Sequence, residues 1–443
     1  KIKKNKKTNK ILHLNKQNEM INKLDFTLTK DQLKSLEEIN QDLCSSTKMF
    51  RLLQGDVGSG KTIVAILSML MAIDNDFQAC IMAPTEILAQ QHFNTISETL
   101  SKLDIRIDIL TGSKKTKGRK VLLEELENGN INLLIGTHAL LEDTVKFNNL
   151  GFVVIDEQHR FGVAQRAKLW KKNTYPPHVL VMTATPIPRT LSMTLYGDLD
   201  VSIIDELPPG RKEVKTLWRS DSSRLKIIRF MHEQIKLGRQ IYIVFPLIDE
   251  SAKLDYKNLI EGYDSIVREF PLPDFQVSVV HGQMKAEDKE YEMQRFVNGT
   301  TDILVATTVI EVGVNVPNAS VMIIESAERF GLSQLHQLRG RVGRGANQSY
   351  CILMSGNKLS ADGKTRLQTM IDTNDGFKLA EVDLKLRGPG DMMGTKQSGM
   401  LNFKIADIIK DNKILLFARE TALKLIEDDF DLSKSENINI ARY

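Results

Sequence analysis

The segment at residues 55–62, G-D-V-G-S-G-K-T, constrains the fold of this 443-residue chain more than any other. Largely apolar residues precede it at 50–53 and follow it at 63–67, which predicts a strand, a glycine-rich turn and a helix start. Such a turn folds backbone N–H groups around the phosphates of a nucleotide, with the lysine on the β- and γ-phosphates and the threonine on Mg²⁺. The residues expected to line this site are Gly55, Asp56, Val57, Gly58, Ser59, Gly60, Lys61 and Thr62.

Composition places the chain among ordinary globular proteins, with 42% hydrophobic and 26% charged residues. Its length predicts two or three domains, and no apolar run approaches the roughly 18 residues that a membrane-spanning helix needs. The three cysteines, Cys44, Cys80 and Cys351, lie far apart without metal-like spacing. We expect them to be small buried side chains in a reducing cytosol.

The net charge of +4 comes from one end of the chain. Residues 1–20 carry seven lysines and one glutamate, so the remainder sits near −2 and gives no sign of a basic, nucleic-acid-binding body. We expect residues 1–23 to be a disordered connector. Because the chain begins at Lys1, we also expect it to be a fragment without its amino-terminal part.

Short apolar stretches alternate with helical patterns twice along the chain, which predicts an α/β fold with two parallel sheets in series. Residues 205–211, D-E-L-P-P-G-R, interrupt both patterns and are interpreted as a hinge. The expected units are a first lobe at 24–206, a second lobe at 207–355 and a helical region at 356–443. The predicted strands are Leu52–Gln54, Ala79–Ala83, Ile105–Leu110, Leu133–Gly136, Phe152–Ile155, Val179–Met182, Ile241–Phe245, Val277–Val280, Ile303–Ala306, Val321–Ile324 and Ser349–Leu353.

An acidic pair follows one of these strands, in the sequence D-E-Q-H at 156–159. A carboxylate at the carboxyl end of a parallel strand beside a phosphate loop can hold Mg²⁺, and its neighbour can orient the attacking water. We therefore assign Asp156 to the metal and Glu157 to the water. Thr183 and Thr185, in T-A-T at the end of the next strand, are expected to relay nucleotide state to lobe motion.

Two arginines near the end of the second lobe complete the expected site. Arg341 and Arg344 are three residues apart, so on a helical turn they share a face and can reach one anion together. Guanidinium groups suit the charge that develops on a γ-phosphate. Because the second lobe would supply these guanidinium groups, hydrolysis of a nucleotide bound to the first lobe would depend on closure of the two lobes.

Weaker signals surround these motifs. Gln32 and Phe26 fit adenine recognition, and they fit equally well as helix-start and core residues. Lys114–Lys120 is either a phosphate-steering segment or a solvated loop. Polar residues just after predicted strands can meet a nucleic-acid backbone and form a candidate single-strand track. The residues assigned to this track or to coupling are Pro84, Thr85, Thr137, Thr183, Thr185, His281, Thr308 and Gln337.

Taken in order, these motifs resemble those of superfamily 2 helicases, and more closely the bacterial branch-migration helicase family RecG. The matching segments are G-D-V-G-S-G-K-T, A-P-T-E-I-L-A at 83–89, D-E-Q-H-R-F-G-V at 156–163, M-T-A-T-P-I-P-R-T-L at 182–191, H-Q-L-R-G-R-V-G-R-G at 336–345 and the translocation-motif-like segment 374–399. The resemblance covers about residues 24–443. It implies two tandem RecA-like lobes followed by a helical hairpin and loop that couple lobe closure to DNA, with Arg366, Arg387 and Gln397 at the key polar positions.

The resemblance also implies ATP and Mg²⁺ as cofactors, forked and four-way DNA as substrate, and unwinding with 3′-to-5′ polarity. It further implies a monomer in the bacterial cytoplasm, associated with the nucleoid, with no membrane partner and a possible contact to single-strand-binding protein. From the residues themselves, Gly388, Pro389, Gly390 and Gly394 predict a loop in the translocation-motif segment.

The sequence departs from the family pattern at Asn315, where relatives often carry Asp, and we expect the amino-terminal wedge domain of the family to be missing. Without a wedge the motor could hydrolyse ATP yet bind forks poorly. Two alternatives stay open at this stage: a transcription-repair coupling translocase, which shares the translocation motif, and a non-catalytic DNA-binding remnant.

Overall fold

The computed structural model describes most of the chain. The described residues are 10–112, 116–156, 172–173, 175–184, 199–206, 208, 212–246, 252–307, 316–343, 345 and 347–391, with scattered residues between 411 and 437. Within them, no helix is both long enough and apolar enough to cross a membrane.

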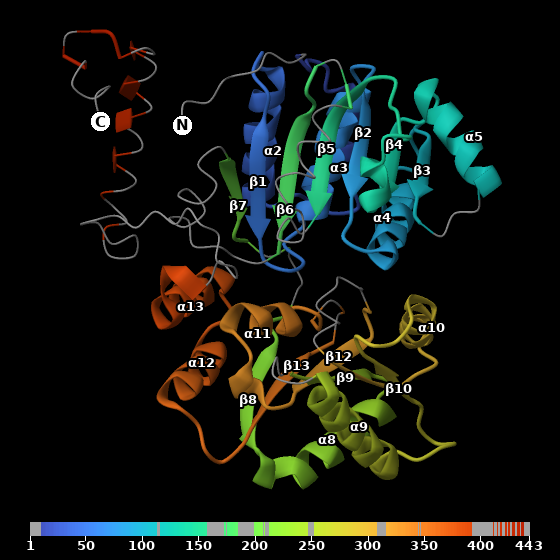
Figure 1. Cartoon of the computed structure of the whole chain (residues 1–443), viewed down its shortest axis with the longest axis vertical. Coiled ribbons are helices and arrows are strands. Elements are labelled where there is room, and N and C mark those ends of the chain that lie inside the picture. The colour runs from blue at the N-terminus through green and yellow to red at the C-terminus, as the bar shows by residue number, and fades with distance from the viewer. Residues whose placement is uncertain are drawn as a thin grey trace.

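The first lobe is built on a parallel sheet of seven strands in the order β3-β4-β2-β5-β6-β1-β7 (Figure 1). Its strands are β1 (Phe50–Gly55), β2 (Gln78–Met82), β3 (Ile107–Leu110), β4 (Leu133–Gly136), β5 (Leu150–Asp156), β6 (His178–Thr183) and β7 (Asp200–Ile204). The surrounding helices are α1 (Asn15–Lys23), α2 (Lys30–Cys44), α3 (Lys61–Ile73), α4 (Glu86–Thr99), α5 (Thr116–Glu127) and the short 3₁₀ helix His138–Leu141. Neighbouring strand residues such as Val153 and Val154 join different hydrophobic cores, so the sheet is buried on both faces.

The second lobe has a parallel sheet of six strands in the order β10-β11-β9-β12-β13-β8. Its strands are β8 (Lys215–Ser220), β9 (Gln240–Phe245), β10 (Val277–Val280), β11 (Ile303–Thr307), β12 (Ala319–Ile324) and β13 (Tyr350–Ser355). Its helices are α8 (Arg224–Lys236), α9 (Ala252–Glu269), α10 (Ala286–Val297), α11 (Leu332–Arg339), α12 (Ala361–Asp372) and α13 (Gly376–Asp391). In Figure 1, α11 and α13 lie on the side of this lobe that faces the first lobe.

The predicted α/β fold with two tandem parallel-sheet lobes is therefore confirmed, and all eleven predicted strands are present, with bounds that differ by at most two residues. Two strands were missed. β7 and β8 lie at the edges of their sheets and carry polar or exposed residues, so neither has the continuous apolar run of a central strand.

The expectation that residues 1–23 form a disordered connector is wrong for residues 10–23. Residues 15–23 form α1, which packs against α3, and the side chains of Ile11, Gln17 and Met20 are buried. Gln17 donates a hydrogen bond of 3.0 Å to the Leu67 carbonyl of α3. The lysine-rich composition concealed this contact because a few apolar side chains on one helix face are enough to dock the segment.

A second correction concerns the predicted loop at Gly388–Gly390. The backbone of α13 is helical through Asp391, so the Gly-Pro-Gly segment lies in its last turns. The earlier turns are fixed by Leu379, Ala380 and Leu384, which are buried. Packing of this kind overrides local propensity and extends the helix through residues that on their own favour a turn.

The expected burial of the cysteines is confirmed for two of the three thiols. Cys80 and Cys351 are fully buried in β2 and β13, and burial raises the pKa of each to about 12. Cys44, at the end of α2, is partly exposed, and its thiol donates a hydrogen bond to the Ile11 carbonyl.

Docking of α1 can be tested with Met20→Ala. Removing this buried side chain should cost about 2–4 kcal/mol of packing free energy, because it leaves a cavity in the hydrophobic cluster that Met20 shares with the first lobe. Limited proteolysis should then cut residues 10–23 faster while the sheet of the first lobe stays protected. The control is Leu12→Ala, since 60% of the Leu12 side chain is already exposed. Equal cleavage rates in the two variants would contradict the docking.

Candidate active site

The phosphate loop has the backbone geometry that its glycines predict. β1 ends at Gly55 and α3 begins at Lys61, with Gly58 at φ 79° and Gly60 at φ 88° in the left-handed region. At Gly55, an added Cβ would lie 2.6 Å from Ser59 Oγ and 2.7 Å from the Ile204 carbonyl oxygen, so no side chain fits there. The turn therefore places backbone N–H groups and the first turn of α3 where phosphates bind.

Lys61 points back into this loop. Its Nζ donates hydrogen bonds to the carbonyl oxygens of Gly55 at 2.7 Å and Asp56 at 2.9 Å. An ammonium group held at the rim of a phosphate loop can transfer its hydrogen bonds to phosphate oxygens without a large movement.

Gln32 supports the loop from α2. Its side chain is 2% exposed, and its Nε2 donates a hydrogen bond of 2.8 Å to the Ser59 carbonyl. Its Oε1 accepts from the Thr29 backbone N–H while the Thr29 hydroxyl accepts from the Gln32 backbone, which makes the predicted helix start a capping box. The helix-start role is therefore confirmed, and adenine recognition stays a prediction. Phe26, the suggested stacking partner, is 55% exposed.

Asp156 is the last residue of β5. Its side chain is hydrogen-bonded to a histidine that the sequence did not suggest. His92 on α4 approaches Asp156 Oδ2 with its Nε2 at 2.9 Å. Burial acts to raise the pKa of Asp156, but the His92 hydrogen bond and the charges of Lys61 and Arg341 outweigh it and hold the pKa below its usual range. Asp156 is therefore an ionised carboxylate at neutral pH.

These residues fit a nucleotide with Mg²⁺. A magnesium ion in such sites binds one or two protein oxygens and takes its other ligands from phosphates and water. The ionised Asp156 and the Thr62 hydroxyl are the two protein oxygens that could serve as such ligands. Among the described residues, no group of three His, Cys, Asp or Glu side chains is placed to form an all-protein metal site.

The second lobe reaches this site at three points. The electrostatic influence of Arg341 on Asp156 crosses the interface between the lobes. His336 Nε2 lies 2.9 Å from Asp56 Oδ1 in the phosphate loop. Gly340 faces Val57 so closely that an added Cβ would lie 2.8 Å from the Val57 Cβ. The described part of the second lobe thus contacts the phosphate loop directly.

The expectation that Arg341 lies on a helix is wrong in detail. α11 ends at Arg339 with Gly340 as its C-cap, and Arg341 lies in the following turn, which ends at Gly343 with φ 82°. Gly340 keeps helical dihedrals at φ −68°, and the left-handed residue at which the chain turns is Gly343. The backbone of Arg341 is nevertheless held in that turn, because its N–H donates a hydrogen bond of 3.0 Å to the Leu338 carbonyl.

The residues assigned to a DNA track lie, where described, at the carboxyl ends of strands. Pro84 and Thr85 follow β2, Thr137 follows β4, Thr183 ends β6 and His281 follows β10. The Thr85 hydroxyl accepts from the Leu88 N–H and caps α4, which gives it a structural role. Burial and the nearby Lys289 charge lower the pKa of His281, which leaves its imidazole neutral at pH 7.

Two of the coupling residues are placed by the described helices. Gln337 is half-buried on α11, and Arg366 of α12 donates a hydrogen bond of 2.8 Å to the Phe330 carbonyl just before α11. Arg387 lies on the α13 backbone, and its side chain is outside the described residues. Also outside the described residues are Glu157, Thr185, Thr308, Asn315, Arg344 and Gln397.

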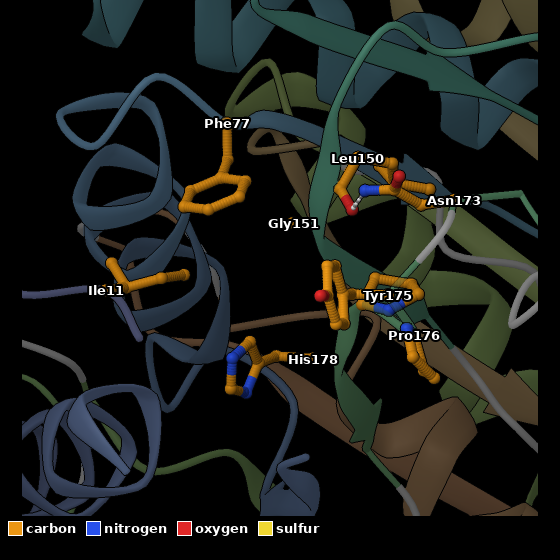
Figure 2. Close-up of a pocket in the computed structure, with 9 residues that line it drawn as sticks. Ile11, Phe77, Leu150, Gly151, Asn173, Tyr175, Pro176 and His178 are labelled. Atoms are coloured by element: carbon orange, nitrogen blue, oxygen red, sulfur yellow. Dashed lines mark hydrogen bonds between the residues drawn. The ribbon is translucent and has the colours of Figure 1, made fainter. Parts of the chain in front are cut away.

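A small pocket lies elsewhere in the first lobe (Figure 2). It is formed by Ile11, Phe77, Leu150, Tyr175, Pro176 and His178. β5 and β6 begin there, at the end of the sheet opposite the phosphate loop. The pocket is therefore separate from the nucleotide site.

The phosphate loop can be tested with Gly60→Ala. The substitution strains a residue at φ 88° and puts a Cβ 2.2 Å from Gln32 Nε2, so either the Gln32 side chain gives up its hydrogen bond to the Ser59 carbonyl or the loop shifts. A fluorescent ATP analogue should bind about tenfold or more weakly, the result of losing ~1.4 kcal/mol or more. Gly238→Ala is the matched control, since it has φ 74° but open space around the new Cβ. Equal affinity in the two variants would contradict the site.

Comparisons with known protein families agree with this site. Residues 29–194 match the DEAD/DEAH box helicase family, residues 224–346 the helicase conserved C-terminal domain, and residues 373–442 the C-terminal part of domain 3 of ATP-dependent DNA helicase RecG. The chain is 50% identical over 417 residues to "ATP-dependent DNA helicase RecG" of Synechocystis, covering 94% of this chain and 50% of that protein. For the Bacillus subtilis protein of the same name the identity is 51% over 409 residues, covering 92% of this chain and 60% of that protein. The chain thus spans about half to three-fifths of these relatives.

Comparisons with solved structures also find a RecG protein. A structure of RecG bound to a three-way DNA junction superposes with a TM-score of 0.79 at 42% identity, covering 93% of this chain and 53% of that one. The DNA-bound DUF1998 helicase MrfA, at 16% identity and a TM-score of 0.61, shows likeness of fold alone. The tandem lobes, the phosphate loop contacted from both of them, and these matches together place the chain in the RecG family of ATP-dependent DNA helicases.

Proposed function

We propose that this chain is the motor of an ATP-dependent DNA helicase that remodels branched DNA. The observation that carries the proposal is the contact of the second lobe with the phosphate loop of the first, through His336 and Gly340, together with the influence of the Arg341 charge on Asp156. A nucleotide bound there would touch both lobes, so its hydrolysis would change their relative position. The RecG relative whose structure contains a three-way DNA junction supports branched DNA as the substrate class.

Within this proposal each residue has a defined task. Lys61, Thr62 and Asp156 would hold ATP with Mg²⁺, and the metal would supply a positive charge that neutralises the phosphate oxygens. Gln32 and the loop glycines keep the backbone N–H groups aimed at the phosphates. Arg341, with Arg344, would stabilise the charge that develops during hydrolysis from the side of the second lobe. Glu157 would orient the attacking water.

The finer features come from the family resemblance. We propose Holliday-junction branch migration and regression of stalled forks in recombination and repair, with 3′-to-5′ polarity. We also propose a monomer in the bacterial cytoplasm, near the nucleoid, with a contact to single-strand-binding protein. Thr137, Thr183 and His281 would contact DNA at the strand ends, and Arg366, Arg387 and Gln397 would couple lobe movement to it.

The proposal predicts that Lys61→Ala and Arg341→Ala each abolish DNA-stimulated ATP hydrolysis. Removing one preorganised charge of this kind typically costs ~3 kcal/mol of transition-state stabilisation, about a hundredfold in rate. Phosphate release should be measured with and without forked DNA. Lys226→Ala and Arg229→Ala on the exposed side of α8 are the matched controls. Near-normal turnover in the Lys61 or Arg341 variant would show that the site is assigned wrongly.

A further inference from the structure

His92 occupies a position on α4 where an apolar side chain is expected. It lies four residues after Leu88 and four before Ile96, so the three side chains share one helix face. Leu88 and Ile96 are buried in the hydrophobic core of the first lobe, and the His92 side chain is 12% exposed. Burying an imidazole there costs free energy unless its polar atoms find partners. The partner is Asp156, whose Oδ2 lies 2.9 Å from His92 Nε2.

This hydrogen bond uses one of the two carboxylate oxygens. An ionised carboxylate can only accept, so His92 Nε2 carries the proton and donates it to Oδ2. Among the described residues, none donates a hydrogen bond to Oδ1 of Asp156. The histidine therefore holds the carboxylate at one oxygen and leaves the other available to a cation.

The second lobe offers an internal comparison, because its sheet repeats the strand order of the first. The order β10-β11-β9-β12-β13-β8 corresponds strand for strand to β3-β4-β2-β5-β6-β1. In the first lobe β5 pairs with β2 through Ile155, and in the second β12 pairs with β9 through Ile324. The next residue is acidic in both lobes, Asp156 in the first and Glu325 in the second. These two carboxylates are therefore at equivalent places.

Glu325 is bound in a different way from Asp156. Arg224, the first residue of α8, donates from Nη1 to Glu325 Oε1 and from Nη2 to Glu325 Oε2, each at 2.8 Å. A guanidinium fork of this kind occupies both oxygens of its partner. The single imidazole nitrogen of His92 occupies only one. The equivalent carboxylates are thus a closed ion pair in the second lobe and an acceptor with one oxygen left in the first.

We propose that His92 is a positioning residue, which holds the Asp156 carboxylate by Oδ2 so that Oδ1 is left to bind the Mg²⁺ of a nucleotide. This rests on the proposed function and adds to it a residue from outside the phosphate loop and the acidic motif. A carboxylate at a strand end can rotate about its side-chain bonds, and a hydrogen bond to one oxygen restricts that rotation. Loss of such a partner behind a metal ligand typically weakens metal binding about 10- to 100-fold.

The test compares nucleotide binding with and without magnesium. A fluorescent ATP analogue is titrated in EDTA and in excess MgCl₂ against the unaltered chain and His92→Phe, in which the ring fills space on α4 but donates no hydrogen bond. The affinity in EDTA should be unchanged, because the phosphate loop is unaltered. The affinity in MgCl₂ should fall about tenfold. Equal affinities of the two chains in MgCl₂ would overturn the inference.

Two further substitutions separate positioning from packing. In His92→Gln the amide nitrogen can take the place of Nε2 and donate to Asp156, so most of the affinity in MgCl₂ should return. In His92→Asn the amide is too short to reach Asp156, so the loss should persist. If the Gln variant loses as much as the Asn variant, or if both also bind more weakly in EDTA, His92 has a merely structural role and the inference is overturned.

The control is Gln90→Ala on the exposed side of the same helix. The Gln90 amide donates a hydrogen bond of 2.9 Å to Asn94 Oδ1, so the substitution removes a contact of α4 without touching Asp156. Its affinities should match those of the unaltered chain in both conditions. A loss confined to MgCl₂ in this variant would show that any weakening of α4 has the same effect, which contradicts a specific role of His92. Failure of the analogue to bind the unaltered chain would overturn the proposed function and this inference with it.

Discussion

The close approach of Gly340 to Val57 is the constraint on which the other contacts of the site depend. Only a residue without a Cβ allows the backbone at position 340 to come so near the Val57 side chain, since a methyl group would lie 2.8 Å from the valine Cβ. At this separation His336 reaches Asp56, and the charge of Arg341 influences Asp156. One glycine therefore sets the distance across which the two lobes act on each other.

Parallel sheets explain why so many polar residues meet at this place. All strands of each sheet run in one direction, so the segments that follow β1, β2, β4, β5 and β6 leave the same edge. The sheet topology alone therefore brings together the phosphate loop, Asp156 and the threonines at the strand ends. The helices behind the sheets, above all the almost wholly buried α3, supply the packing that holds this edge in place.

The central strands could be predicted from the sequence because burial on both faces leaves a continuous apolar run, as at residues 150–155. The edge strands β7 and β8 lack that run and were missed. The phosphate loop and Asp156 were also predictable, because each is a local pattern. His92 and His336 were not, because their partners are 64 and 280 residues away and a lone histidine on a helix gives no sign of a distant carboxylate. The ordering of α1 likewise depends on a surface that only the folded first lobe provides.

The arrangement of the thiols has a practical consequence. Cys80 and Cys351 lie within sheet strands, where burial keeps them protonated and out of reach of maleimides and oxidants. Only Cys44 offers sulfur at the surface. A chain in which Cys44 is replaced by serine would therefore react only weakly with thiol-reactive dyes. Two cysteines introduced at exposed positions, one on each lobe, could then be labelled selectively. Single-molecule energy transfer between the two dyes would report the distance between the lobes.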